Sequence, residues 1–160
     1  MRQPEGREVV IVDAVRTPIG RGHKEKGYYK DTHPNTLLAK CYTEVIERSG
    51  IDAAEVEDVI AGCVQQFGEQ GFNIARNAWL QAGLPIETPG TTVDRQCGSA
   101  QQAVNFSAAL IAAGVHDAMI GSGVEHMGHL PFAAGMKTQE DFGYAFTPEL
   151  MAKHNIVGQG

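Results

Sequence analysis

A long run without any charged residue, residues 98–113, constrains the fold more than any other stretch of this chain. Its alanine and larger apolar side chains recur at helical spacing. A surface helix carries a polar face, so a helix of this composition is expected to be buried on all sides. Its small side chains allow other layers to approach closely. We therefore expect a central helix in a larger, layered protein of which this chain is one part.

A strand and a tight turn precede this helix. The β-branched residues 91–93 predict the strand, and the polar corner after them delivers Cys97 at or next to the helix N-terminus. Unpaired N–H groups and the partial positive charge of a helix start favour the thiolate, which is the nucleophilic form of cysteine. The residues alone leave a second interpretation open, in which Cys97 is a small buried hydrophobe.

Strands and helices alternate along the rest of the chain up to residue 124. Continuous apolar runs predict further buried strands, at residues 9–12, 58–64 and 117–123. Amphipathic spacing predicts two further helices, over residues 34–49 and 74–82. Thr32 or His33 is the expected N-cap of the first and Gly50 its end, Asn73 is the expected N-cap of the second, and Asp52 is expected to cap a single turn between them. Four strand–helix alternations indicate an α/β protein whose parallel sheet has right-handed crossovers.

Composition and charge exclude several classes of function. The net charge of −6 argues against a nucleic-acid surface and against an anionic membrane surface. The chain has neither an apolar run of membrane-spanning length nor the pattern of a signal peptide. Its three cysteines lack disulfide or metal-site spacing, and Cys41 and Cys63 are predicted to lie in the core. We expect a cytoplasmic location, with a matrix-type compartment after processing as the alternative.

Two short motifs near the end of the last predicted strand are weak signals. Gly121 and Gly123 match the start of a dinucleotide-binding fingerprint, but position 126 is histidine where the fingerprint needs glycine. Close backbone packing at a strand end explains these glycines better. His126 and His129 have metal-ligand spacing but lack a cysteine or acidic partner at the right distance in sequence. The sequence therefore predicts no metal site.

Five stretches together resemble the thiolase family. They are VRTPIG at 15–20, GCVQQ at 62–66, NIAR at 73–76, DRQCGS at 94–99 and GVEHMGH at 123–129. The similarity runs from about Val9 to the end of the sequence and is greatest to degradative 3-ketoacyl-CoA thiolases of fatty-acid β-oxidation. Ketoacyl-carrier-protein synthases have a different pattern around their cysteine and fit less well.

The resemblance implies a layered αβαβα architecture made of two similar halves, with the cysteine-bearing helix in the middle layer. This chain would supply most of the N-terminal αβα half. Residues 1–124 would form this half-domain without its last strand, and residues 125–160 would begin an inserted loop domain. The loss of periodicity at Glu125 agrees with that boundary. Family members are homodimers or homotetramers.

The resemblance also implies acyl-CoA C-acyltransferase activity with Cys97 as the nucleophile. Cys97 would accept the acyl group of a 3-ketoacyl-CoA as a thioester, with its backbone N–H as one oxyanion-hole donor. Acetyl-CoA would leave, and CoA would then release a shortened acyl-CoA; the reverse reaction is a Claisen condensation. CoA is a substrate here, no cofactor is expected, and no residue is assigned to CoA binding.

The sequence departs from the family pattern because the catalytic histidine, the second cysteine and the glycine that completes the oxyanion hole belong to the family's second half. None of the histidines lies in the catalytic motif; they are His23, His33, His116, His126, His129 and His154. We therefore expect a fragment that is inactive alone. Two alternatives stay open: a non-catalytic binding or assembly subunit of a thiolase-like complex, and a ketoacyl-synthase-like condensing enzyme.

Overall fold

Three parallel strands form the sheet of this protein. The computed structural model describes residues 7–132 and 134–156. The strands are β1 (Asp58–Gly62), β2 (Gly90–Val93) and β3 (Met119–Gly123), in the order β2-β1-β3. Gly62 at the end of β1 is in register with the last residues of β2 and β3. The carboxyl ends of all three strands therefore meet at one edge of the sheet.

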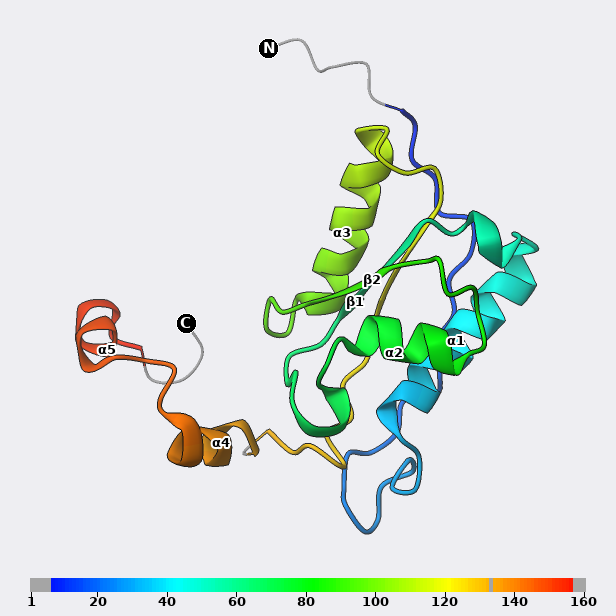
Figure 1. The fold of residues 1–160 in the computed structure, drawn as a ribbon. Helices are drawn as coiled ribbons and strands as arrows, with labels where there is room; N and C mark the ends of the chain where they lie inside the picture. Colours follow the sequence, from blue (N-terminus) through cyan, green and yellow to red (C-terminus); the bar gives the residue numbers. More distant parts are fainter. Residues whose placement is uncertain (1–6, 133, 157–160) are drawn as a thin grey trace.

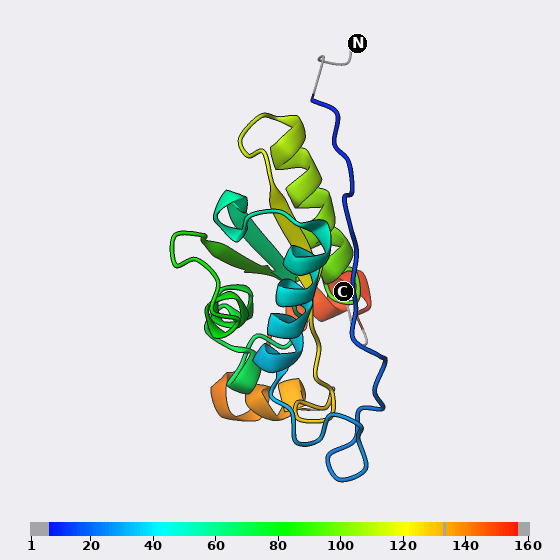
Figure 2. The same ribbon diagram turned by 90° about the vertical axis from the view of Figure 1, so that its right-hand side faces the viewer.

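Helices cover both faces of the sheet (Figures 1 and 2). Helices α1 (Pro34–Ser49) and α2 (Ile74–Gln81) lie on one face, and α3 (Ser99–Ala112) lies on the other. The chain passes from β1 to β2 through α2 and returns across β1 to β3 through α3. The two connections run in opposite directions along the sheet and lie on opposite faces of it, as right-handed crossovers require. The predicted α/β class is confirmed.

Local sequence signals explain where the helices begin and end. His33 Nδ1 accepts the Asn35 N–H at 3.1 Å and so caps α1, and Gly50 ends this helix with a φ of 71°. Asn73 caps α2 through its side-chain oxygen, as predicted. A single 3-10 turn, η1 (Ala53–Glu55), has the expected Asp52 cap, and η2 (Gly68–Gln70) is a second such turn.

The hydrophobic core lies between the sheet and the α1/α2 layer. Alternate residues of a strand point to the same face, and on β1 and just beyond it these are Val59, Ala61 and Cys63, all at most 1% exposed. They pack with large side chains of the two helices, which are Leu38, Tyr42, Ile74 and Trp79. Cys63 is therefore a core residue, as predicted. Cys41 is only half-buried.

Glycines bring α3 into close contact with the opposite face of the sheet. A Cβ atom placed on Gly62 would lie 2.2 Å from the Ala100 backbone N, and one on Gly123 would lie 2.6 Å from the Ala100 Cβ. A Cβ atom on Gly121 would lie 2.8 Å from the Val104 Cα. Only glycine permits such an approach between backbones. Close packing thus explains the Gly121 and Gly123 motif.

The predicted strand at residues 9–12 is wrong for the described part of the chain. These residues are extended but belong to no ladder, and Ile11 is 79% exposed. Arg48 Nη2 donates to Asp13 Oδ1 at 2.9 Å and so holds the segment near α1. A cavity of about 730 Å³ lies between this segment and β3. An apolar run forms a strand only where a neighbouring backbone pairs with it, and the cavity separates the two backbones.

Helix α3 is also less buried than its composition predicts. Ser99, Ala103 and Ser107 form its buried face against the sheet, whereas Phe106 is 45% exposed. Within the described residues α3 therefore packs on one side only, and a layer on its outer side stays a prediction. This difference arises because the apolar composition of a helix predicts that it is buried but does not identify the segment that packs against it.

The chain beyond β3 contains two short helices, α4 (Ala134–Phe142) and α5 (Pro148–His154), neither of which has a buried residue. Both lie away from the sheet in Figure 1. The domain boundary between residues 124 and 125 stays a prediction. Among the helices described, none is both long and apolar enough to cross a membrane.

The contact between Gly62 and Ala100 yields a stability prediction. We expect Gly62→Ala to lower the free energy of unfolding by about 1–3 kcal/mol, because the new methyl group forces α3 away from β1. Urea unfolding followed by circular dichroism measures this change. Gly135→Ala is the matched control, since its Cβ would approach only Gln65 Oε1, at 3.8 Å. Equal stability of the two variants would contradict the prediction.

Candidate active site

Side chains at both ends of the turn between β2 and α3 fix its shape. Asp94 Oδ1 accepts the Gln96 N–H at 2.7 Å. Ser99 Oγ accepts the Arg95 N–H at 2.9 Å and donates to the Gln96 carbonyl oxygen at 2.6 Å. The Gly98 N–H donates to the Arg95 carbonyl oxygen at 3.0 Å. Aspartate and serine commonly bond to nearby backbone in this way, and here they hold the turn from both sides.

Cys97 lies in this turn, immediately before Gly98, the N-cap of α3. The preceding residue, Gln96, has a φ of 49°, so the backbone turns sharply just before the cysteine. The Cys97 side chain is exposed. Its predicted position beside a helix N-terminus is confirmed.

The other two cysteines have different surroundings. Cys63 is 1% exposed, and its sulfur accepts a hydrogen bond from Gln70 Nε2 at 3.3 Å. Burial raises the pKa of the Cys63 thiol to about 12, with the nearby Glu125 carboxylate as a second cause. A thiol with that pKa is inert at neutral pH. Since Cys41 is half-buried, Cys97 is the one exposed thiol of the three.

Glu125 joins the ends of β1 and β3, a role that the sequence reasoning missed. Its Oε2 accepts the Val64 N–H at 2.7 Å, and its Oε1 accepts the Gln65 N–H at 3.4 Å and Gln70 Nε2 at 2.9 Å. Gln70 Oε1 in turn accepts the His126 N–H at 2.6 Å. Glu125 lies two residues beyond the end of β3. A polar side chain just after a strand of a parallel sheet was the sequence signal that could have identified this role.

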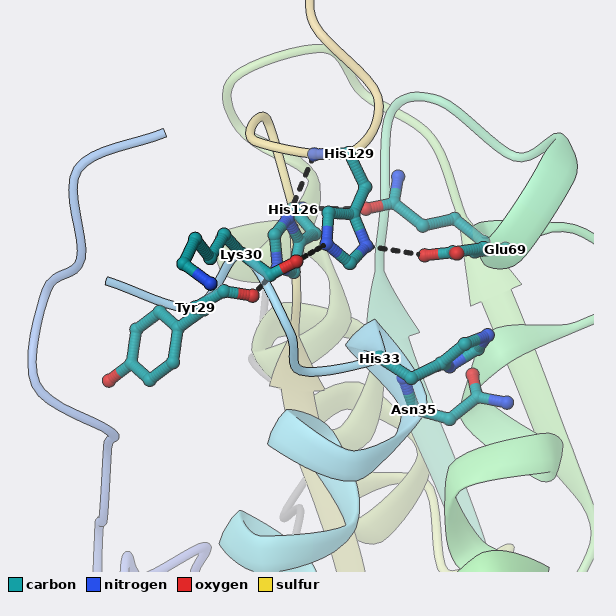
Figure 3. Close-up of polar contacts among 8 residues, drawn as sticks. Tyr29, Lys30, His33, Asn35, Glu69, His126 and His129 are labelled. Atoms are coloured by element: carbon teal, nitrogen blue, oxygen red, sulfur yellow. Dashed lines mark hydrogen bonds and ion pairs between the residues drawn. The ribbon is translucent and has the colours of Figure 1, made fainter. Parts of the chain in front are cut away.

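The two histidines after β3 form a hydrogen-bonded pair of stacked rings (Figure 3). His126 Nε2 contacts the Tyr29 carbonyl oxygen at 3.0 Å, and its Nδ1 accepts the His129 N–H at 3.1 Å. His129 Nδ1 lies 2.7 Å from Glu69 Oε2, and its Nε2 lies 2.7 Å from the Lys30 carbonyl oxygen. All four ring nitrogens therefore have partners.

A metal ligand needs a free ring lone pair, so this pair of histidines does not fit a metal site. Among residues 7–132 and 134–156 there is no group of three or more histidine, cysteine, aspartate or glutamate side chains that could hold a metal ion. Two other histidines, His23 and His33, accept backbone N–H bonds near α1. His116 lies 3.8 Å from the Glu57 carboxylate.

The large cavity and Cys97 lie at different places on the sheet. The cavity borders β3 and the extended segment at residues 8–22. Cys97 follows β2, which is the opposite outer strand in the order β2-β1-β3. Cys97 is accordingly not among the residues that line the cavity.

Comparison with known proteins shows the family. Residues 9–157 match the family model described as thiolase, N-terminal domain. The chain is 46% identical over 137 residues to the steroid 3-ketoacyl-CoA thiolase FadA6 of Mycobacterium tuberculosis, covering 86% of this chain and 33% of that protein. It is 43% identical over 162 residues to a 3-ketoacyl-CoA thiolase of Yersinia pestis, covering 94% of this chain and 41% of that protein.

A solved structure agrees with the sequence matches. The fold is similar to that of the Bacillus anthracis acetyl-CoA acetyltransferase, with a TM-score of 0.72 and 36% sequence identity over 79% of this chain and 31% of that chain. This chain spans about a third to two-fifths of the length of these relatives. Because the family model covers nearly all of its residues, the chain belongs to the thiolase family.

Proposed function

We propose that this chain is the nucleophile-bearing part of an acyl-CoA C-acyltransferase that cleaves 3-ketoacyl-CoA with CoA, or runs the reverse Claisen condensation. The observation that carries this proposal is the exposed Cys97 on a rigid turn at the start of α3. Relatives that are 43–48% identical to this chain are named 3-ketoacyl-CoA thiolases, and this similarity supports the proposal.

In the cleavage direction, the Cys97 thiolate attacks the 3-keto carbon and forms a carbon–sulfur bond. The bond between C2 and C3 then breaks, and its electron pair stays on C2, which takes a proton and leaves as acetyl-CoA. The CoA sulfur next attacks the acyl thioester, and the proton of the CoA thiol returns to Cys97. The backbone N–H of Cys97 is proposed as one oxyanion donor, as the resemblance implies.

The proton transfers of this reaction need an acid and a base. The family resemblance assigns these roles to a histidine and a second cysteine in the half that is not present in these 160 residues. Histidines of this chain instead bond to backbone groups near α1 and to one another after β3. We therefore propose that the chain binds and transfers acyl groups only together with that second half.

The remaining proposals concern partners and setting. The substrates are CoA and acyl-CoA, with no separate cofactor, and the complete protein is a homodimer or homotetramer. Its place is fatty-acid β-oxidation in the cytoplasm. The odd number of cysteines and their lack of disulfide spacing in the sequence support a reducing compartment, because disulfides rarely persist there.

The central experiment detects the acyl-enzyme. We expect full-length protein incubated with a 3-ketoacyl-CoA to gain one acyl group on the tryptic peptide that carries Cys97, and Cys97→Ala to gain none. Mass spectrometry of the intact protein and of the peptide measures this. Cys41→Ala is the matched control and should be acylated normally.

Acylation at a different residue, or full thiolysis by Cys97→Ala, would overturn the proposed function. An unmodified wild-type protein that still binds CoA would favour the binding-subunit alternative. Decarboxylative condensation without thiolysis by free CoA would favour a ketoacyl-synthase-like enzyme. Measurable thiolysis by the isolated 160 residues would contradict the proposed need for the second half.

Exposure of the thiols predicts their order of alkylation. In the folded chain, we expect iodoacetamide to modify Cys97 first and Cys63 only after unfolding, because Cys63 is buried and its thiol pKa is raised to about 12. Peptide mapping with and without urea tests this order. Modification of Cys63 as fast as Cys97 under native conditions would be inconsistent with the structure.

The Ser99 hydroxyl yields a further prediction. Ser99→Ala removes the hydrogen bonds of the Ser99 hydroxyl to the Arg95 N–H and the Gln96 carbonyl oxygen, so we expect Cys97 acylation to slow roughly tenfold and stability to fall by about 1 kcal/mol. Single-turnover acylation of the full-length protein measures the rate. Ser107→Ala, which loses one hydrogen bond within the same helix, is the control and should keep the normal rate.

A further inference from the structure

The strongest feature that the proposed function does not use is the contact of His129 with two hydrogen-bond acceptors on different segments (Figure 3). Its Nδ1 lies 2.7 Å from the Glu69 carboxylate on η2, and its Nε2 lies 2.7 Å from the Lys30 carbonyl oxygen in the loop before α1. The His129 side chain is 21% exposed. We call this three-residue arrangement the His129 bridge.

The chemistry of the two acceptors determines the protons on the ring. A backbone carbonyl oxygen can only accept a hydrogen bond, and an ionised carboxylate can only accept one. Both ring nitrogens must therefore carry a hydrogen, and a histidine with two N–H groups is an imidazolium cation. We propose that His129 is an imidazolium cation near neutral pH and that its two N–H groups hold the turn after β3 to η2 and to the loop before α1.

His126 provides an internal contrast. Its Nδ1 accepts the His129 N–H at 3.1 Å and must be without a hydrogen, so its Nε2 carries the hydrogen that is donated to the Tyr29 carbonyl oxygen. His126 is thus a neutral ring with one defined tautomer. The two rings stack with centroids 4.0 Å apart and planes 25° apart, which places the cation over a neutral aromatic face.

The groups that surround His129 agree with a positive charge. The Lys30 carbonyl oxygen and, after it, the Glu69 carboxylate raise the pKa of His129 above its usual value, and Asp31 adds to this effect. The Lys30 ammonium group pairs with the Asp31 carboxylate, so it is partly neutralised. Near the start of α1, the His33 ring points to the backbone of Asn35 and serves as a helix cap.

The His129 bridge makes the packing of these loops depend on pH. A group with a raised pKa in the folded state stabilises the fold most at pH values below its unfolded pKa, and it loses this effect as the pH rises through the folded pKa. When His129 loses one proton, one of its two contacts is lost. At alkaline pH the turn at residues 126–130 is then held more weakly, either to η2 or to the loop at residues 27–31.

Long-range proton–nitrogen NMR on the ¹⁵N-labelled full-length protein tests the proposal directly. At about pH 7 we expect two protonated ring nitrogens for His129 and one for His126, on Nε2. On titration, the His129 midpoint should lie above the midpoint of the same residue in urea. A neutral His129 at this pH, or a midpoint at or below the unfolded one, would overturn the proposal.

Two variants test whether the positive charge of His129, and not only its packing, stabilises these contacts. Glu69→Gln keeps an acceptor but removes the negative charge, so we expect the His129 midpoint to fall, whereas Glu140→Gln, on the exposed side of α4, should leave it unchanged. His129→Gln should lower the unfolding midpoint below that of wild type at about pH 6, and the difference should shrink towards about pH 9. A difference that grows with pH, or an unmoved midpoint in Glu69→Gln, would refute the inference.

Discussion

The packing of α3 against the glycines of β1 and β3 is the contact on which the rest of this structure depends. Gly62 and Gly123 lack side chains where the first turn of α3 crosses them, so the Ala100 backbone packs against Gly62 and its methyl group against Gly123. This contact fixes the start of α3, and the start of α3 fixes Cys97 two residues earlier. A methyl group at either glycine would alter the position of the nucleophile as well as the stability of the sheet.

The parallel sheet then gathers the polar chemistry at one edge. Cys97 follows β2, Val64 follows β1 and Glu125 follows β3, because all three strands end on the same side. The Glu125 carboxylate joins two of these ends. Beyond it, the imidazolium assigned to His129 connects the same edge to the loop before α1. One row of loops therefore carries both the proposed nucleophile and the pH-dependent contact.

Strand pairing is the property that local sequence predicted least well. Residues 9–12 have the composition of a buried strand, yet the cavity of about 730 Å³ separates them from β3. Outward-facing Phe106 on α3 shows the same effect for a helix. Both patterns state a need for burial that the described residues do not meet. They agree with the predicted layered thiolase architecture, in which a further layer would cover the outer side of α3.

The sequence by itself determined the alternation of strands and helices, the caps at Asn73 and Gly50, and the place of Cys97 before a helix, because these depend on neighbouring residues. Only the tertiary structure decided the strand order, the role of Glu125 and the charge of His129. Each of these rests on contacts between segments some thirty or more residues apart, and no local pattern specifies which distant segment a residue meets.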